Sequence, residues 1–137
     1  MKEIEDREDV RKLVYTFYGK VRKDELLGPI FNSQLSEEQW PSHLEKLTDF
    51  WETNLFRIPK FKGNPMGAHQ RVDAHTNRGI TQKHFATWLR LWKETLEELF
   101  EGERAERAME AARRMSTPMF IGVWGNRPEN RSHMMYY

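Results

Sequence analysis

The chain has 137 residues, the size of one domain with a single core. Charged residues make up 31% of it, but their signs nearly cancel to a formal net charge of +1, so no strong field attracts nucleic acid or an anionic membrane. Cysteine is absent, which excludes disulfides, thiolate metal sites and cysteine nucleophiles and leaves His, Asp and Glu as the metal ligands to consider.

Apolar periodicity in the first half of the chain predicts two amphipathic helices. The first ends near Gly28-Pro29 and carries its stripe at helical spacing on Val10, Leu13, Val14, Phe17 and Val21. A short turn, GPIFNSQ, follows it. Ser36 is then expected to cap a second helix, with acidic residues in its first turn. The apolar face of that second helix is Trp40, Leu44, Leu47, Phe50, Trp51 and Leu55.

The second half of the chain predicts two further helices after a loop at RIPKFKG and one or two helical turns started by Pro65. Thr81 is the expected N-cap of the third helix, and Gly102 closes it. Its apolar face is Phe85, Trp88, Leu89, Trp92, Leu96 and Leu99. The last helix runs from about Glu103 and turns inward Ala105, Ala108, Met109, Ala112, Met115 and Met119.

No alternating β pattern or internal repeat occurs, so the predicted class is all-α. We expect one domain over residues 1–124 and a flexible C-terminal tail over 125–137. The polar start MKEIEDRE and the lack of any bilayer-length apolar run predict a cytoplasmic protein that binds neither membrane nor nucleic acid.

Four amphipathic helices can simply form a bundle, but two features argue for more. Five tryptophans and eight phenylalanines are many for a bundle of this size, whose layers are usually filled by Leu, Ile and Val. Polar groups also lie on or beside apolar faces: Tyr18 follows Phe17, His43 precedes Leu44, and Trp88 opens an aromatic face. Buried Tyr and Trp need hydrogen-bond partners. Wide, flat side chains with such groups suit a wide, flat ligand.

The segments FYGKVRKDELLGPIF, WPSHLEKLTDFW, GNPMGAH and HFATWLRLWKETLEELFEG occur in this order. Together they resemble the group III truncated haemoglobins over roughly residues 8 to 122. The resemblance implies a truncated globin fold, in which two pairs of antiparallel helices, two over two, sandwich haem b. Much of the usual first helix and most of the proximal helix are lost in that family.

The resemblance also implies an iron ligand. His69, the histidine of GNPMGAH, matches the proximal ligand of the family. Its imidazole would bind iron through one nitrogen and donate from the other to a carbonyl. Taken by itself, such a residue is an ordinary surface histidine. His75 is the next candidate ligand should His69 not bind the iron.

On the distal side, Tyr18 in YTFY and Trp88 in HFATWL match the groups that donate hydrogen bonds to bound dioxygen in the family. Without the resemblance, we expect Tyr18 to be a rim residue and Trp88 a core residue. His43 in WPSH matches the distal histidine, which swings toward or away from the iron; its alternative is a solvent-facing helix residue.

Further residues are expected around the ring of the cofactor. Phe31 in GPIF should pack on its distal face, and Leu47 and Phe50 should roof the ligand site. Basic side chains in RIPKFK are candidates to pair with the haem propionates, with Arg71 as an alternative: Arg57, Lys60 and Lys62. Where the family often has tyrosine, this chain has phenylalanine at position 61, so a hydrogen bond of that phenol is lost.

The resemblance implies small diatomic ligands: dioxygen, nitric oxide and carbon monoxide. Several donors around the ligand would retain dioxygen, which favours redox chemistry such as nitric oxide or peroxide detoxification, with an unidentified reductase as partner. The alternatives are a dioxygen carrier, scavenger or sensor without turnover, and a haem-free helical interaction protein.

Overall fold

The computed structural model describes residues 1–57 and 82–126, with side chains described up to residue 115 in the last helix. Over these residues the protein is all-helical, as predicted, apart from one isolated bridge between Lys2 and Phe100. The helices are α1 (Arg7–Lys23), α2 (Gly28–Gln34), α3 (Trp40–Phe56), α5 (Gln82–Leu99) and α6 (Glu103–Asn126). None of the described helices is long and apolar enough to cross a membrane.

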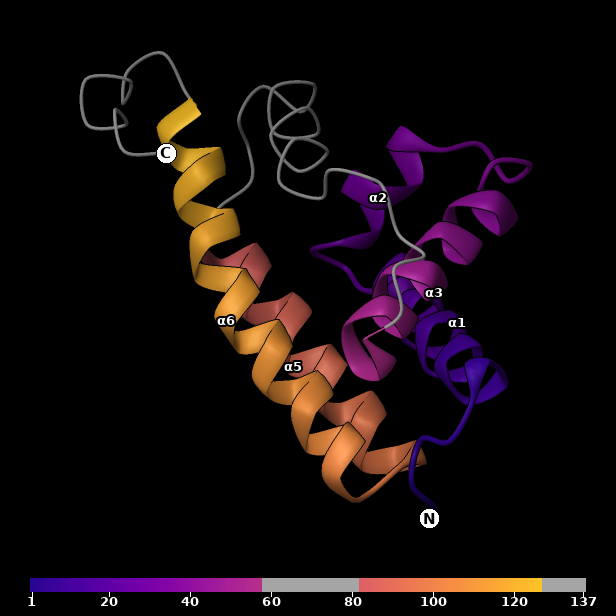
Figure 1. Ribbon diagram of the computed structural model, residues 1–137. Coiled ribbons are helices and arrows are strands. Elements are labelled where there is room, and N and C mark those ends of the chain that lie inside the picture. The colour runs from indigo at the N-terminus through magenta and orange to yellow at the C-terminus, as the bar shows by residue number, and fades with distance from the viewer. Residues whose placement is uncertain (58–81, 127–137) are drawn as a thin grey trace.

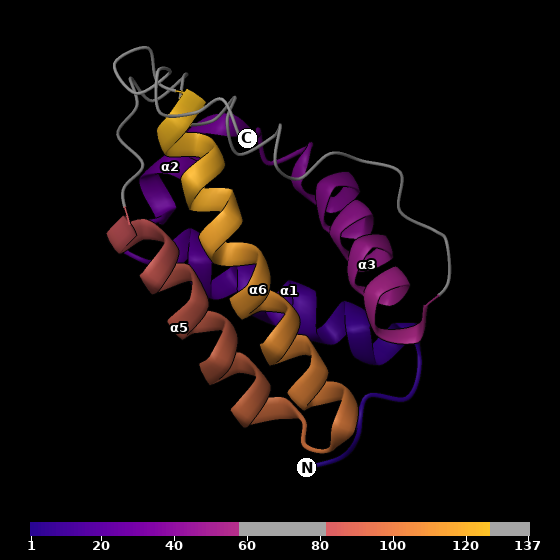
Figure 2. The ribbon, with the colours of Figure 1, turned by 60° about the vertical axis from the view of Figure 1, so that its left-hand side comes forward.

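The helices form two packed groups (Figure 1). Helices α5 and α6 lie side by side and antiparallel, and α1 packs against both α3 and α5. The C-terminal end of α3 contacts the start of α6, where the Arg107 guanidinium donates to the Leu55 carbonyl at 3.0 Å. From this contact the two helices diverge, as both Figure 1 and Figure 2 show, so the N-terminal end of α3 lies away from α6.

The segment GPIFNSQ, which the sequence predicted as a turn, is the helix α2, and that prediction was wrong. Pro29 fits its first turn because a proline lacks only an N–H that would have no helical partner there. The Asp24 carboxylate accepts from the N–H groups of Leu26 and Leu27, both at 2.9 Å, and so orders the approach. A Cβ on Gly28 would lie 2.7 Å from the Arg22 carbonyl oxygen, so this close approach requires glycine.

Ser36 does not cap α3, contrary to the sequence prediction. Helix α3 begins at Trp40, and the residue before it, Gln39, makes no side-chain cap. The Gln39 side chain instead accepts from the Ser36 N–H at 2.8 Å. The backbone N–H of Gln39 donates to the Ser36 carbonyl at 3.0 Å. Pro41 lies in the first turn, where the missing donor costs nothing.

The ends of the last two helices follow the prediction where the structure describes them. Gly102 has a φ of +98°, a conformation that glycine adopts without strain, and α6 begins at Glu103. The predicted cap Thr81 and the turns at Pro65 lie outside the described residues. Helix α6 extends to Asn126, just past the expected start of the tail, and the boundary at residue 124 stays a prediction.

The centre of the core is the fully buried indole of Trp92. Its ring meets Phe17 of α1 edge to face at 4.8 Å and stacks on Trp51 of α3 at 4.4 Å. Its Nε1–H donates to the Ala108 carbonyl of α6 at 3.1 Å. One α5 side chain therefore contacts α1, α3 and α6, with its polar atom satisfied.

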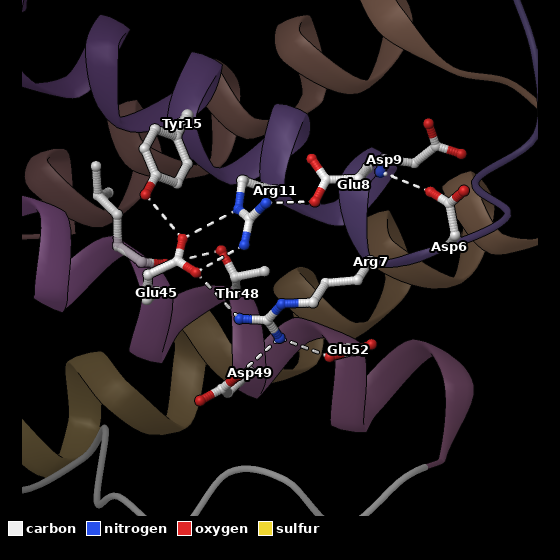
Figure 3. Close-up of polar contacts among 11 residues, drawn as sticks. Asp6, Arg7, Glu8, Asp9, Arg11, Tyr15, Glu45, Thr48, Asp49 and Glu52 are labelled. Atoms are coloured by element: carbon white, nitrogen blue, oxygen red, sulfur yellow. Dashed lines mark hydrogen bonds and ion pairs between the residues drawn. The ribbon is translucent and has the colours of Figure 1, made fainter.

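Helices α1 and α3 are also joined by ion pairs at their edge (Figure 3). The Arg7 guanidinium donates to Asp49 and Glu52 at 2.7 Å each and to Glu45 at 3.3 Å. These carboxylates, Asp49 first, raise the pKa of Arg7 above its ordinary value, so the guanidinium stays charged at any physiological pH. One arginine thus contacts two turns of α3.

Glu45 receives the other donors of this cluster. Arg11 donates to its two carboxylate oxygens at 3.1 and 2.9 Å, and the Tyr15 hydroxyl donates at 2.8 Å. The hydrogen bonds from Arg11, then from Tyr15, hold the pKa of Glu45 at about 2, below its usual 4.5. Because the bonds favour the ionised form, they stabilise the folded state only while Glu45 is charged.

Glu45→Gln should therefore lower the free energy of unfolding at pH 7 by about 1 kcal/mol, a modest value because water reaches 38% of the Glu45 side chain and screens its charge. The folded-state pKa is depressed, so the contribution is complete above about pH 4.5 and is lost as the pH falls toward about 2. Urea unfolding of parent and variant across this range measures the change.

Glu8→Gln, which removes a mostly exposed carboxylate paired with the same Arg11, is the control and should have little effect. If Glu45→Gln instead lowers the free energy of unfolding by the same amount at every pH, the charge of Glu45 is not what stabilises the contact between α1 and α3.

Candidate functional site

Tyr18 of α1 and Trp88 of α5 both contact the ring of Phe17. The Phe17 ring is 4.7 Å from Tyr18 and 5.4 Å from Trp88, edge to face in both cases. Both polar aromatics are buried, Tyr18 with 6% and Trp88 with 8% of its surface exposed. The structure thus brings together two donors that are 70 residues apart in the sequence.

These two donors differ in how they are satisfied. Burial raises the pKa of Tyr18 to about 12, so the phenol keeps its proton at any physiological pH. The Trp88 indole is near enough to oppose that rise, but the geometry falls short of a hydrogen bond. The Trp88 Nε1–H has no partner among the described residues. A buried donor without an acceptor is costly, so this N–H is available to a bound acceptor.

His43 lies on α3 and is half-buried rather than solvent-facing. Its ring meets the Trp40 indole edge to face at 5.5 Å, and Trp40 lies 6.3 Å from Tyr18. Burial, and then repulsion from Lys46, lowers the pKa of His43 below 6.5, so the imidazole is neutral at pH 7. A neutral imidazole offers one donor and one acceptor.

The apolar residues predicted around the ligand site are only partly covered. Phe31 of α2 lies 6.1 Å from Tyr18, with the two rings tilted by 58°. Leu47 and Phe50 follow His43 by one and two turns on α3. All three pack against the core but are half-buried, so apolar surface beside Tyr18 and His43 remains accessible.

The remaining predicted residues belong to the segment after α3. Arg57 terminates α3 in a left-handed conformation, with φ 58°, and its side chain is exposed. His69, Lys60 and Lys62 lie outside the described residues, as do His75 and Arg71. Their roles stay predictions.

Sequence reasoning overlooked Trp40, which it placed only in an apolar stripe. In the structure this indole contacts both His43 and Tyr18. Only 2% of its surface is exposed, and its Nε1–H has no partner among the described residues. The spacing of Trp40 and His43 could have indicated their contact, because residues three apart share a helix face. Trp40 is one turn before His43, in the segment WPSH.

Two sequence comparisons relate this chain to known proteins. The family described as "Bacterial-like globin" matches residues 2–121. The group 3 truncated haemoglobin ctb of Campylobacter jejuni is 35% identical over 100 residues, which cover 72% of this chain and 75% of that protein.

A solved structure agrees with the sequence comparisons. The crystal structure of the group III truncated haemoglobin from Campylobacter jejuni superposes with a TM-score of 0.76 and 32% sequence identity. The match covers 87% of this chain and 92% of that one. The similarity therefore extends over nearly all of both chains.

The burial of Tyr18 predicts a late step in the titration of the tyrosines. NMR of protein labelled with carbon-13 at tyrosine Cζ should show one phenol with a pKa of about 12, because ionisation would bury a charge. Burial and the hydrogen bond to Glu45 also raise the pKa of Tyr15, so the Tyr18→Phe spectrum assigns the pKa of about 12 to Tyr18. Tyr18→Phe should remove that resonance and leave the other three tyrosines unchanged. Ionisation of the Tyr18 phenol near pH 10 would show that water reaches it and that the site is open.

Proposed function

Because the chain belongs to the group III truncated haemoglobins, within the bacterial-like globin family, we propose that it binds haem b through His69 and uses it for redox chemistry on nitric oxide or peroxide. Membership of the family implies a haem and a small gaseous ligand. The identity of the haem, its histidine ligand and the reaction are the proposal.

The described residues suit such a cofactor. Haem is a flat, largely apolar group, and the half-buried side chains of Phe31, Leu47 and Phe50 offer apolar surface beside Tyr18 and His43. The Trp88 Nε1–H supplies a donor that has no hydrogen-bond partner among the described residues. When bound, the haem iron supplies the site for dioxygen and the electron needed to convert nitric oxide and dioxygen to nitrate.

The observation that carries the proposal is the Trp88 N–H beside the neutral Tyr18 phenol. Dioxygen bound in haem proteins carries partial negative charge, which such donors stabilise without reorganisation. Carbon monoxide is a poorer acceptor and is stabilised less. The two donors therefore favour retention of dioxygen until a second reactant arrives, which suits chemistry better than delivery.

The remaining residues have supporting roles in the proposal. His43, neutral at pH 7, adds a third polar group, which contacts the same Trp40 indole as Tyr18 does. Arg57, together with Lys60 and Lys62, pairs with the propionates. A reductase in the cytoplasm returns the electron that each turnover consumes.

Loss of either aromatic donor should speed the release of dioxygen. Each hydrogen bond to a charged acceptor contributes on the order of 1 to 3 kcal/mol, and 1.4 kcal/mol is a factor of about ten. Tyr18→Phe and Trp88→Phe should therefore each raise the dioxygen dissociation rate roughly tenfold, measured by stopped flow, with a much smaller change for carbon monoxide.

Trp92→Phe is the matched control for this experiment. It removes an indole from the same helix, one turn further on, whose N–H is already bonded to Ala108. Because phenylalanine keeps an aromatic ring against Phe17 and Trp51, this variant should lower stability and change dioxygen release less than the loss of either donor. Dissociation rates within twofold of the parent for both Tyr18→Phe and Trp88→Phe would make these residues packing residues only.

His69→Ala should abolish stable haem retention, because one protein–iron bond anchors the cofactor. His75→Ala is the matched variant in the same segment and should keep haem. Absorption spectra of the ferrous carbon monoxide forms measure both outcomes. A normal spectrum for His69→Ala together with a lost one for His75→Ala would transfer the ligand role to His75.

The reaction itself is tested by mixing the dioxygen-loaded protein with nitric oxide. Nitrate should form in one-to-one yield and much faster than dioxygen is released. Slow or absent nitrate formation, and no turnover of peroxide, would support a carrier, scavenger or sensor instead.

A further inference from the structure

The geometry points to a further positioning residue: we infer that Trp40, held beneath the guanidinium of Arg22, fixes the His43 imidazole toward the ligand site. The inference rests on the proposed function, because it takes Tyr18 and His43 to face a bound ligand. It concerns how the chain controls access to that ligand.

Trp40 is packed on both sides by groups with defined geometry. The Arg22 guanidinium carbon lies 4.6 Å from the centroid of the indole ring, a cation–π contact. The His43 imidazole meets the same indole at 5.5 Å, with the ring planes at 85°. Trp40 therefore forms the connection between a surface cation and the distal histidine.

Arg22 is itself held in place by its other contacts. Its Nε–H donates to the Asn32 side chain at 2.8 Å, and the Asn32 amide donates back to the Arg22 carbonyl at 2.9 Å. A second guanidinium nitrogen pairs with the Glu37 carboxylate, in the turn before α3. Helix α2 and this turn thus fix the cation that covers the indole.

Packing, not a hydrogen bond of its own, holds the Trp40 indole as far as the described residues show. Its Nε1–H has no partner there, whereas the Nε1–H of Trp92 is bonded to Ala108. A side chain without a hydrogen bond of its own is oriented by the groups packed against it. Removing Arg22 should therefore loosen Trp40, and through it the half-buried ring of His43.

The expected consequence is faster entry of ligand. Trp40 contacts both His43 and Tyr18. Loosening Trp40 therefore lets the His43 imidazole swing to solvent and clears the approach. Arg22→Ala should speed carbon monoxide association by at least about threefold, since a cation–π contact supports a population shift of that size. Flash photolysis of the haem-loaded protein measures the rate.

Arg104→Ala is the matched control. Arg104 makes a similar cation–π contact, 4.7 Å from the Phe56 centroid, at the opposite end of α3, and also donates to a backbone carbonyl. It should leave the association rate unchanged. An Arg22→Ala rate equal to or slower than that of Arg104→Ala overturns the inference.

A second background shows whether the effect passes through His43. In His43→Ala protein, Arg22→Ala should have no further effect on association, because the group it positions is gone. The same threefold increase in that background would mean that Arg22 acts on the fold or on the entrance directly, and the inference would be wrong.

NMR of the carbon monoxide form, labelled at histidine, provides a readout independent of rates. The His43 ring resonances should shift and broaden in Arg22→Ala and in Trp40→Leu, and stay unchanged in Arg104→Ala. Unchanged His43 resonances in a folded Arg22→Ala protein contradict the inference. Failure of the parent to bind haem or carbon monoxide would instead overturn the proposed function.

Discussion

The packing of Trp92 is the contact on which the rest of this structure depends. Its indole touches Phe17 of α1 and Trp51 of α3, and its N–H is bonded to α6. The two residues proposed to face the ligand belong to the same core. Trp88 lies one turn earlier with its ring nearly parallel to that of Trp92, at 6.2 Å, and Tyr18 follows Phe17 directly. Tyr18 and Trp88, the proposed donors, are therefore part of the hydrophobic core.

The position of α3 is set by two further interactions, one at its middle turns and one at its C-terminal end. Arg7 and Arg11 hold the middle turns to α1 through Glu45 and its neighbours, and Arg107 of α6 holds the C-terminal end through Leu55. Helix α3 carries His43 only two residues before Glu45. Because a helix is stiff, ion pairs on one edge fix the direction of the side chains on the other. Under the proposed function, this one helix therefore links stability to ligand access.

Sequence reasoning was most successful where burial is periodic. The apolar stripes of α1 and α5 predicted helices, and the all-α class followed from the absence of alternation. It failed at α2 and at the start of α3. There the structure depends on hydrogen bonds to the side chains of Asp24 and Gln39 and on the close approach of Gly28 to the Arg22 carbonyl, rather than on apolar periodicity. A seven-residue helix is too short to show a pattern of its own. The candidate site was less predictable still. The local sequence pattern does not distinguish Tyr18 and Trp88 from packing residues. Trp40 contacts Arg22 and Tyr18 of α1 only in the folded chain.

The central claim, that Tyr18 and Trp88 together donate hydrogen bonds to a ligand on haem, is tested most directly by vibrational spectroscopy of the carbon monoxide complex. Nearby donors draw electron density onto the ligand oxygen and weaken the C–O bond. We expect the C–O stretching frequency of the parent to lie clearly below that of the Tyr18→Phe, Trp88→Phe double variant, with each single variant in between. Equal frequencies in the parent and the double variant would contradict the account, because the bound ligand would then meet neither donor.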